Sequence, residues 1–412
     1  MNTLSASLAR SIIKSVGDYG IPPEFGLEHF TVGLDRYLDT LDKEYLSSFV
    51  REGGAAFKML VANYGGGKTH FFYCLRNLAW QHRFVVSYVE LRPGESPFHK
   101  LELVYSAIAR GLVPPLTNQE LLGTYEKGMG PLLRRWAEEK RNELTNKGLE
   151  GNAFQQAVDS YLESLDPGDS VSFSRAVRAA FRVQLEDNWE DFENLVQWLT
   201  GEGFPPVLKK KYGITQKVDK TTALMMLRSL ARWIRQIGYS GLVVLFDEAE
   251  QVPSLPNREK ELHLGNLRQI VDECGHASFQ GLMMFYAVPD ESFLEGRANV
   301  YEALRQRLAT VFTQDNPSGV KIRLEDPAGK EHEILVEIGR RLAKIYSIAY
   351  ECPFEPGALQ TTVTTVAQEA HRRRFGDVGY KRVFMKLAVQ GFSFLRKTRR
   401  APEPTEVEQW EA

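Results

Sequence analysis

The sequence has few cysteines, no long apolar stretch and almost no net charge. Its three cysteines, Cys74, Cys274 and Cys352, lie far apart and form no CxxC pair, which argues against a disulfide scaffold and against structural zinc. No stretch reaches the roughly 18 apolar residues of a membrane span, and the first residues lack the apolar core of a signal peptide. We therefore expect a cytoplasmic protein with reduced cysteines and no membrane association.

The balance of charge limits the classes of partner. Lys and Arg total 51 and Asp and Glu total 53, which gives a formal net charge of −2. The molecule as a whole is therefore not a polycation that binds nucleic acid by charge alone, although local basic patches remain open. With 43% apolar residues in a chain of 412, there is enough hydrophobic material for about two or three packed domains.

Five short apolar runs predict strands, at residues 56–62, 84–91, 241–246, 281–288 and 320–324. They are nearly continuous in apolar residues, which is typical of strands buried on both faces of a parallel sheet. Helix-period patterns follow the first and fourth of these runs, at 68–82 and 300–312. This alternation predicts an α/β fold with a parallel five-stranded sheet.

About 150 residues separate the second and third predicted strands, far more than the dozen or so that a crossover needs. Helix-period segments fill this stretch, at 98–112, 119–147, 153–165, 172–199 and 221–237, and three more follow the fifth strand, at 329–348, 356–373 and 378–396. The predicted organisation is an N-terminal segment with the first part of the core (1–96), a helical insertion (97–236), the second part of the core (237–328), a helical C-terminal lid (329–400) and a flexible tail (401–412).

A glycine-rich loop follows the first predicted strand and precedes a predicted helix. The loop reads Ala62, Asn63, Tyr64, Gly65, Gly66, Gly67, Lys68, Thr69 and is followed by His70. This is the P-loop (Walker A) pattern GxxxxGK[ST] in its required setting, with alanine at the first glycine position. Glycines let backbone N–H groups surround phosphate oxygens, and the helix N-terminus adds its positive dipole end. The loop therefore predicts an ATP site that includes all these residues, the alternative being a glycine-rich turn with an incidental lysine.

Two positions of this loop have distinct chemistry. In a P-loop, the lysine reaches the β- and γ-phosphates and the hydroxyl residue after it holds Mg²⁺. We therefore expect Lys68 to act in catalysis and Thr69 to be a metal ligand.

A second motif ends the third predicted strand, where an apolar run leads into Asp247 and Glu248. A carboxylate at the carboxyl edge of the sheet is suited to Mg²⁺, and a neighbouring carboxylate can polarise the attacking water. We assign Asp247 to the metal and Glu248 to the general base (Walker B). Taken alone, such a strand end is common and would fit an ordinary surface loop better.

The two motifs together resemble the additional-strand class of P-loop ATPases, and the predicted strand order with a helical lid is similar to the AAA+ fold. More narrowly, the chain resembles the ATP-binding proteins BrxC and BrxD of BREX phage-defence systems. The resemblance rests on Gly20-Ile21-Pro22-Pro23 with Phe30-Thr31-Val32-Gly33, on 63–69, and on 238–242 leading into Asp247-Glu248-Ala249-Glu250. It covers about residues 10–110 and 215–400, and the length fits BrxD better.

The resemblance implies further site residues. Relatives wrap the adenine with the segment before the first strand, which makes Ile21 and Pro22 candidates, against the alternative of a plain turn. Arg307 occupies the place of an arginine finger, and its alternative role is a solvated helix charge. Relatives also carry a helix-start arginine after a Gly-Asp pair in the lid. Here Gly376-Asp377 is followed by Val-Gly, so Arg382, one turn on, is the replacement.

Basic residues gather in two places. Residues 371–400 contain ten Lys and Arg against one acid, and Lys209, Lys210 and Lys211 form a second cluster. These could contact DNA phosphates, although charge runs are usually solvated faces.

These observations predict an Mg²⁺-dependent ATPase. The resemblance implies a nucleotide-driven switch or motor component of a multi-protein phage-defence complex, with other subunits of that complex as partners, a homo-oligomer, and DNA contact through the basic lid. The alternative is an ATP-gated, DNA-binding scaffold or regulator of the initiator or loader type with little hydrolysis. A small-molecule kinase is disfavoured by the large insertion and by the lack of a substrate-phosphate lid motif.

Overall fold

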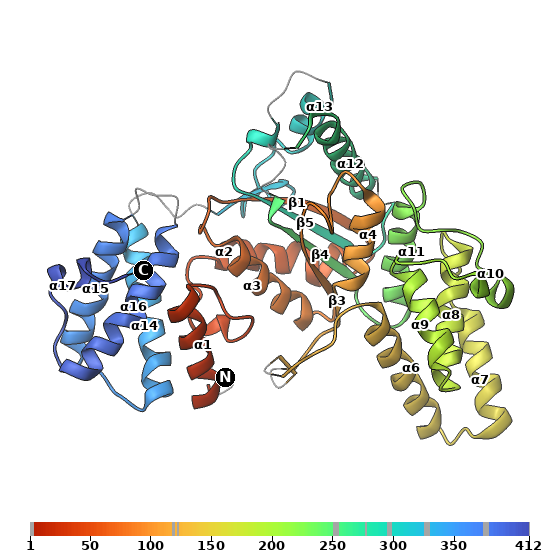
Figure 1. The fold of residues 1–412 in the computed structure, drawn as a ribbon, viewed down its shortest axis with the longest axis horizontal. Coiled ribbons are helices and arrows are strands. Elements are labelled where there is room, and N and C mark those ends of the chain that lie inside the picture. The colour runs from red at the N-terminus through yellow and green to blue at the C-terminus, as the bar shows by residue number, and fades with distance from the viewer. Residues whose placement is uncertain are drawn as a thin grey trace.

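The computed structural model describes residues 4–117, 120–121, 123–249, 255–276, 278–294, 299–324, 330–373 and 379–411. A central sheet has the helices of 129–236 on one side and the C-terminal helices on the other (Figure 1). Within these residues, no helix combines the length and apolar character that a bilayer crossing requires.

The sheet has six strands in the described residues, in the order β3-β2-β4-β5-β1-β6. They are β1 (Ala55–Val61), β2 (Val85–Glu90), β3 (Leu112–Val113), β4 (Leu242–Asp247), β5 (Leu282–Val288) and β6 (Lys321–Arg323). The five predicted strands are all present and pair in parallel. The predicted strand count was wrong, because β3 adds an antiparallel edge to β2. A two-residue strand directly after a helix leaves no apolar run that a sequence pattern could reveal.

Both faces of the sheet are covered, which explains the continuous apolar strands. In β4, Val244 and Phe246 belong to the core on one face, and Val243 and Leu245 belong to the core on the other. The second of these faces is covered by helices that flank β1 in the chain, namely α2 (Asp35–Leu41), the π-helix η2 (Asp42–Phe49) and α3 (Lys68–Gln81). A short 3₁₀ helix, η1 (Leu27–His29), precedes them.

The first face carries the helices of the predicted insertion, and a single apolar cluster runs from the sheet into them. They are α4 (Leu101–Arg110), α6 (Met129–Asn146), α7 (Gly151–Ser164), α8 (Val171–Leu185), α9 (Trp189–Leu199), α10 (Pro206–Tyr212) and α11 (Ala223–Gln236). The pattern at 172–199 had predicted one helix, whereas the structure has two. Asp187 adopts a positive φ of 56°, and the Asn188 side chain accepts a hydrogen bond from the Asp191 N–H to begin α9.

Two further helices accompany the second part of the sheet. They are α12 (Asn257–Gly275) and α13 (Asn299–Arg307), with the short 3₁₀ helix η4 (Ser292–Leu294) before α13.

The C-terminal helices form a separate apolar core that also takes in the other end of the chain. They are α14 (Glu331–Tyr350), α15 (Pro356–Arg372) and α16 (Tyr380–Thr398), and α1 (Ala6–Tyr19) packs against α14 and α16. Ile12 and Val16 of α1 share this core with Leu342 and Phe384. The segment that follows α1 therefore leads from the C-terminal helices directly to the sheet (Figure 1).

The tail at 401–412, predicted to be flexible, instead contains α17 (Pro404–Glu408). Glu403 and Glu406 form a capping box, and Arg373 donates hydrogen bonds to the carbonyls of Val407 and Trp410. Val407 is fully buried in the C-terminal core. One apolar side chain and a complete cap thus order a segment whose prolines and acids suggested fraying.

Lys58 is a buried cation inside β1, with 2% of its surface exposed. Its Nζ donates hydrogen bonds to the Tyr45 hydroxyl (2.7 Å) and to the carbonyls of Pro317 (3.0 Å) and Gly319 (2.6 Å). Burial lowers the pKa of Lys58 to about 7. These bonds attach the segment before β6 to β1, the strand beside it in the sheet.

We expect the contribution of Lys58 to stability to depend on pH. Its folded pKa is about 7, whereas that of an unfolded lysine is about 10.4. Between these values the unfolded chain binds a proton that the folded chain has released. The unfolding free energy should therefore rise with pH relative to that of Lys58→Met, with a slope approaching about 1.4 kcal/mol per pH unit. Urea unfolding of both proteins across this range measures the difference.

Lys14→Met, on the exposed side of α1, is the matched control and should show no such slope. A stability difference between Lys58→Met and the parent that stays flat with pH would contradict the lowered pKa.

Candidate functional site

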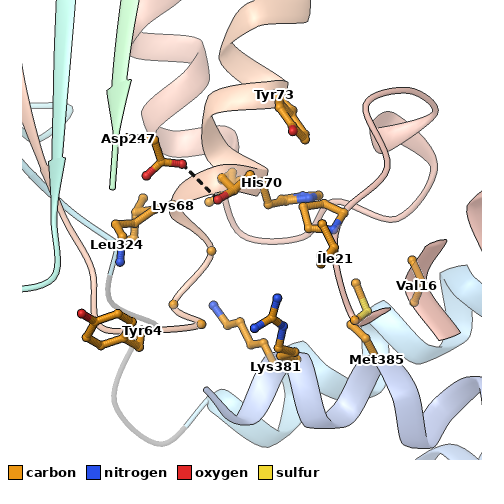
Figure 2. Close-up of a pocket in the computed structure, with 18 of the residues that line it drawn as sticks. Val16, Ile21, Tyr64, Lys68, His70, Tyr73, Asp247, Leu324, Lys381 and Met385 are labelled. Atoms are coloured by element: carbon orange, nitrogen blue, oxygen red, sulfur yellow. Dashed lines mark hydrogen bonds between the residues drawn. The ribbon is translucent and has the colours of Figure 1, made fainter. Parts of the chain in front are cut away.

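A cavity of about 520 Å³ lies at the carboxyl edge of the sheet, between the ends of β1 and β4 and the start of α16 (Figure 2). The carboxyl ends of parallel strands meet at one edge, which is where such folds hold ligands. The predicted site residues that line the cavity are Ile21, Pro22, Tyr64, Gly65, Gly66, Gly67, Lys68, Thr69, His70, Asp247, Glu248 and Arg382. The structure thus gathers segments from four distant parts of the chain around one space.

The loop between β1 and α3 owes its shape to its glycines. Gly65 and Gly67 have φ values of +66° and +98°, a region that side chains rarely adopt. The Gly66 N–H donates to the Asn63 carbonyl (2.9 Å), which closes the turn. Lys68 begins α3, and its Nζ donates to the carbonyls of Ala62 (2.9 Å) and Asn63 (3.4 Å). Ala62 and Asn63 are not among the lining residues, but they hold the lysine that is.

The Asp247 side chain is only 2% exposed and accepts three hydrogen bonds. Its Oδ2 accepts hydrogen bonds from the hydroxyls of Thr69 (3.1 Å) and Tyr88 (2.6 Å), and its Oδ1 accepts one from the Glu248 N–H (2.9 Å). Burial and the Asp247 charge raise the pKa of Tyr88 well above its usual value, so Tyr88 remains a hydrogen-bond donor. Sequence reasoning missed Tyr88, because it belongs to neither motif.

The Thr69 hydroxyl and the Asp247 carboxylate fit a magnesium ion. Both supply oxygen atoms, the ligands that Mg²⁺ prefers, and Mg²⁺ usually takes only one or two protein groups beside phosphates and water. The described residues contain no group of three or more His, Cys, Asp and Glu side chains that could enclose a metal. Thr69 and Asp247 thus supply two oxygen donors, a number that Mg²⁺ commonly takes from a protein.

Carboxylates lie beside this pair. Glu248 follows Asp247 with a positive φ of 60°, which is uncommon for a residue with a side chain. Glu90, at the end of β2, pairs in register with Asp247 and also lines the cavity. Arg92 forms an ion pair with Glu90, and Glu248 directly follows Asp247 in the chain.

The start of α16 touches the glycine-rich loop between β1 and α3 directly. A Cβ atom built on Gly379 would lie 2.5 Å from the Gly65 Cα, and one built on Gly65 would lie 2.6 Å from the Gly379 Cα. Only glycine at both positions allows this approach. The N-termini of α3 and α16 therefore meet at the cavity, and both favour negative charge there.

Two cations enter from α16. Arg382, predicted from the lid pattern, lines the cavity together with Lys381, which the sequence analysis missed. Lys381 extends from α16 toward the P-loop (Figure 2). The available signal was a basic pair that begins two residues after Gly379, the N-cap of α16. Gly376 and Asp377, from which the prediction of Arg382 started, lie outside the described residues.

His70 connects α3 to the segment that follows α1. Its Nε2 lies 2.8 Å from the Thr31 hydroxyl. Burial and the nearby Lys381 charge lower the pKa of His70 to about 4, so it is neutral at neutral pH. The same segment brings Ile21 beside Val16 and Met385, which form an apolar side of the cavity (Figure 2).

Arg307 lies outside this cavity. It forms an ion pair with Asp272 and donates to the Ala303 carbonyl (3.0 Å). It lines a second cavity, of about 540 Å³, together with the first residues of β1, at the opposite edge of the sheet from the P-loop. Within one chain the structure therefore does not bring Arg307 to the other predicted residues.

A family model described as BREX system ATP-binding protein BrxC/D matches residues 4–399. No curated protein and no solved structure matches the chain. The match spans the P-loop, the Asp247-Glu248 strand end and the helices that close the cavity. The chain belongs to the family of BREX system ATP-binding proteins BrxC/D.

Proposed function

We propose that the protein binds ATP with Mg²⁺ in the cavity at the carboxyl edge of the sheet and hydrolyses it. The observation that carries this proposal is the hydrogen bond between Thr69 and Asp247 beside the P-loop lysine (3.1 Å). Hydrolysis would drive a conformational switch or motor within a multi-protein phage-defence complex. The BREX family of ATP-binding proteins supplies the defence context.

The charges around the cavity suit a triphosphate. Lys68, Lys381 and Arg382 line it, and the N-termini of two helices add partial positive charge. The apolar side near Ile21 and Pro22 suits a base. A volume of about 520 Å³ lies within the range of about 300–1,000 Å³ that small-molecule sites occupy.

Each residue has a distinct role in this proposal. Lys68 would leave the loop carbonyls and bind the β- and γ-phosphates. Thr69 and Asp247 would hold Mg²⁺, which neutralises phosphate charge when bound. Glu248 would orient the attacking water and accept its proton.

We also assign the core to the AAA+ type of P-loop ATPase. The strand β5 lies between β1 and β4, as the additional-strand class requires, and a C-terminal helix reaches the P-loop.

The two catalytic assignments predict different losses. Lys68→Ala removes the phosphate-binding charge, so ATP affinity should collapse. Glu248→Gln keeps its shape but cannot accept a proton, so it should bind ATP and hydrolyse it about 100-fold more slowly. Equilibrium binding of ATP and steady-state phosphate release measure the two effects. Parent-like turnover in Glu248→Gln would refute the role of that residue.

The contact between Gly65 and Gly379 predicts a steric variant. Gly379 has a φ of −59°, which alanine adopts freely, so Gly379→Ala adds only a methyl group against the P-loop. We expect ATP to bind about tenfold more weakly, since such overpacking costs about 1–3 kcal/mol. Gly265→Ala, which meets nothing within 4 Å, is the control. Parent-like affinity in Gly379→Ala would show that the contact is unimportant for binding.

Arg307 is proposed as an arginine finger for a neighbouring subunit, since it lies outside the cavity of its own chain. Arg307→Ala should then bind ATP but lose turnover, and a mixture with Lys68→Ala should regain part of it, because shared sites can be completed. Asp272→Asn is the control, since it breaks the ion pair but keeps the arginine. Equal loss in both variants, or no recovery in the mixture, would assign Arg307 a structural role.

The alternative is an ATP-gated, DNA-binding scaffold with little turnover. Many cations that suggested it have partners within the C-terminal helices. Arg372 and Arg373 pair with Glu369, Arg400 pairs with Glu406, and Arg396 lies over the Tyr350 ring, while Arg374 lies outside the described residues. In the second cluster, Lys211 pairs with Asp191 and Lys209 and Lys210 are exposed. Turnover measured with and without DNA separates the two functions.

A further inference from the structure

Tyr88 stands out among the groups around Asp247 because no motif includes it. It lies on β2, the strand next to β4, two residues before the position that pairs with Asp247. Its hydroxyl donates to Asp247 Oδ2 (2.6 Å), the same oxygen that accepts the Thr69 hydroxyl (3.1 Å). This carboxylate oxygen is thus held from two different elements, β2 and α3.

The ring of Tyr88 is held in place by packing. It lies edge-on to Phe72, with ring centroids 6.2 Å apart, and tilted against Tyr73 at 5.7 Å. Both of these residues belong to α3, the helix that begins with Lys68. The position of the hydroxyl is therefore fixed by the same helix that carries Thr69.

We propose that Tyr88 is a positioning residue for Mg²⁺, acting through the Asp247 carboxylate. The inference rests on the proposed function, in which Thr69 and Asp247 hold the ion. Without the Tyr88 hydroxyl, the carboxylate keeps only the Thr69 hydroxyl on Oδ2 and the Glu248 N–H on Oδ1, so it is held less firmly and its oxygen would spend less time facing the metal. Groups that orient a metal ligand in this way commonly change metal affinity by about 10–100-fold when they are removed.

The test is Tyr88→Phe, which keeps the ring and its packing and removes only the hydroxyl. A fluorescent, non-hydrolysable ATP analogue is bound first with excess EDTA and then with increasing Mg²⁺. We expect the affinity for the metal-free analogue to stay within about twofold of the parent. The Mg²⁺ concentration at half effect should rise about tenfold.

Tyr286→Phe is the matched control. Tyr286 lies on β5, the strand beside β4, and is not among the residues that line the cavity. The substitution removes another buried tyrosine hydroxyl, which lies 2.6 Å from the Nε2 atom of His263. It should lower the melting temperature without moving the Mg²⁺ midpoint. Melting curves of both variants without Mg²⁺ report the structural cost of each lost hydrogen bond.

The outcomes separate this inference from the proposed function. If the parent shows no Mg²⁺-dependent binding of the analogue, the proposed function fails. If the parent responds and Tyr88→Phe has the parent's midpoint, only the role of Tyr88 is refuted. The role is also refuted if Tyr88→Phe loses metal-free and metal-dependent binding equally, because the hydroxyl would then be purely structural.

Discussion

The arrangement of the site depends on one desolvated carboxylate, that of Asp247. A charge that is 2% exposed is costly unless its oxygens are hydrogen-bonded. Its hydrogen-bond donors are the Thr69 hydroxyl of α3, the Tyr88 hydroxyl of β2 and the backbone N–H of the next residue, Glu248. Thr69 and Asp247 are 178 residues apart in the chain, so the helices between β2 and β4 must return β4 to the middle of the sheet for this contact to form.

A second constraint is the backbone contact between the P-loop and the start of α16. Glycines on both sides let the two backbones meet, and Lys381 and Arg382, which follow Gly379, line the cavity together with Lys68. Repulsion among these cations and Lys68 opposes this arrangement in the absence of an anion. In the proposed function, a bound triphosphate would relieve that repulsion and so stabilise the contact between the loop and α16.

Features formed by contiguous residues could be predicted from the sequence, whereas contacts between segments far apart in the chain could not. The glycine-rich loop between β1 and α3 could be predicted because strand, glycines, lysine and helix are contiguous, and the end of β4 at Asp247 because an apolar run ends there. Tyr88 and β3 gave no signal in the sequence. Tyr88 contacts Asp247 on the neighbouring strand β4, and β3 is a strand only because it pairs with β2. The packing of α1 against α14 and α16 joins opposite ends of the chain. An amphipathic pattern shows that a helix has an apolar face, but it does not show which other helix covers that face. The break between α8 and α9 depends on a single positive φ at Asp187, within a continuous helical pattern.

A buried arginine of α3 links this helix to the segment that packs on the C-terminal helices. Arg76 of α3 is 4% exposed and pairs with Glu24 (2.7 Å), which also accepts the Tyr125 hydroxyl (2.7 Å). Leu27 and Phe30 follow Glu24 and belong to the core of the C-terminal helices. Moving those helices away as a body would pull Glu24 from Arg76, and stranding a buried charge costs about 3–5 kcal/mol. This ion pair therefore couples the position of the C-terminal helices to α3, the helix whose first residues line the cavity.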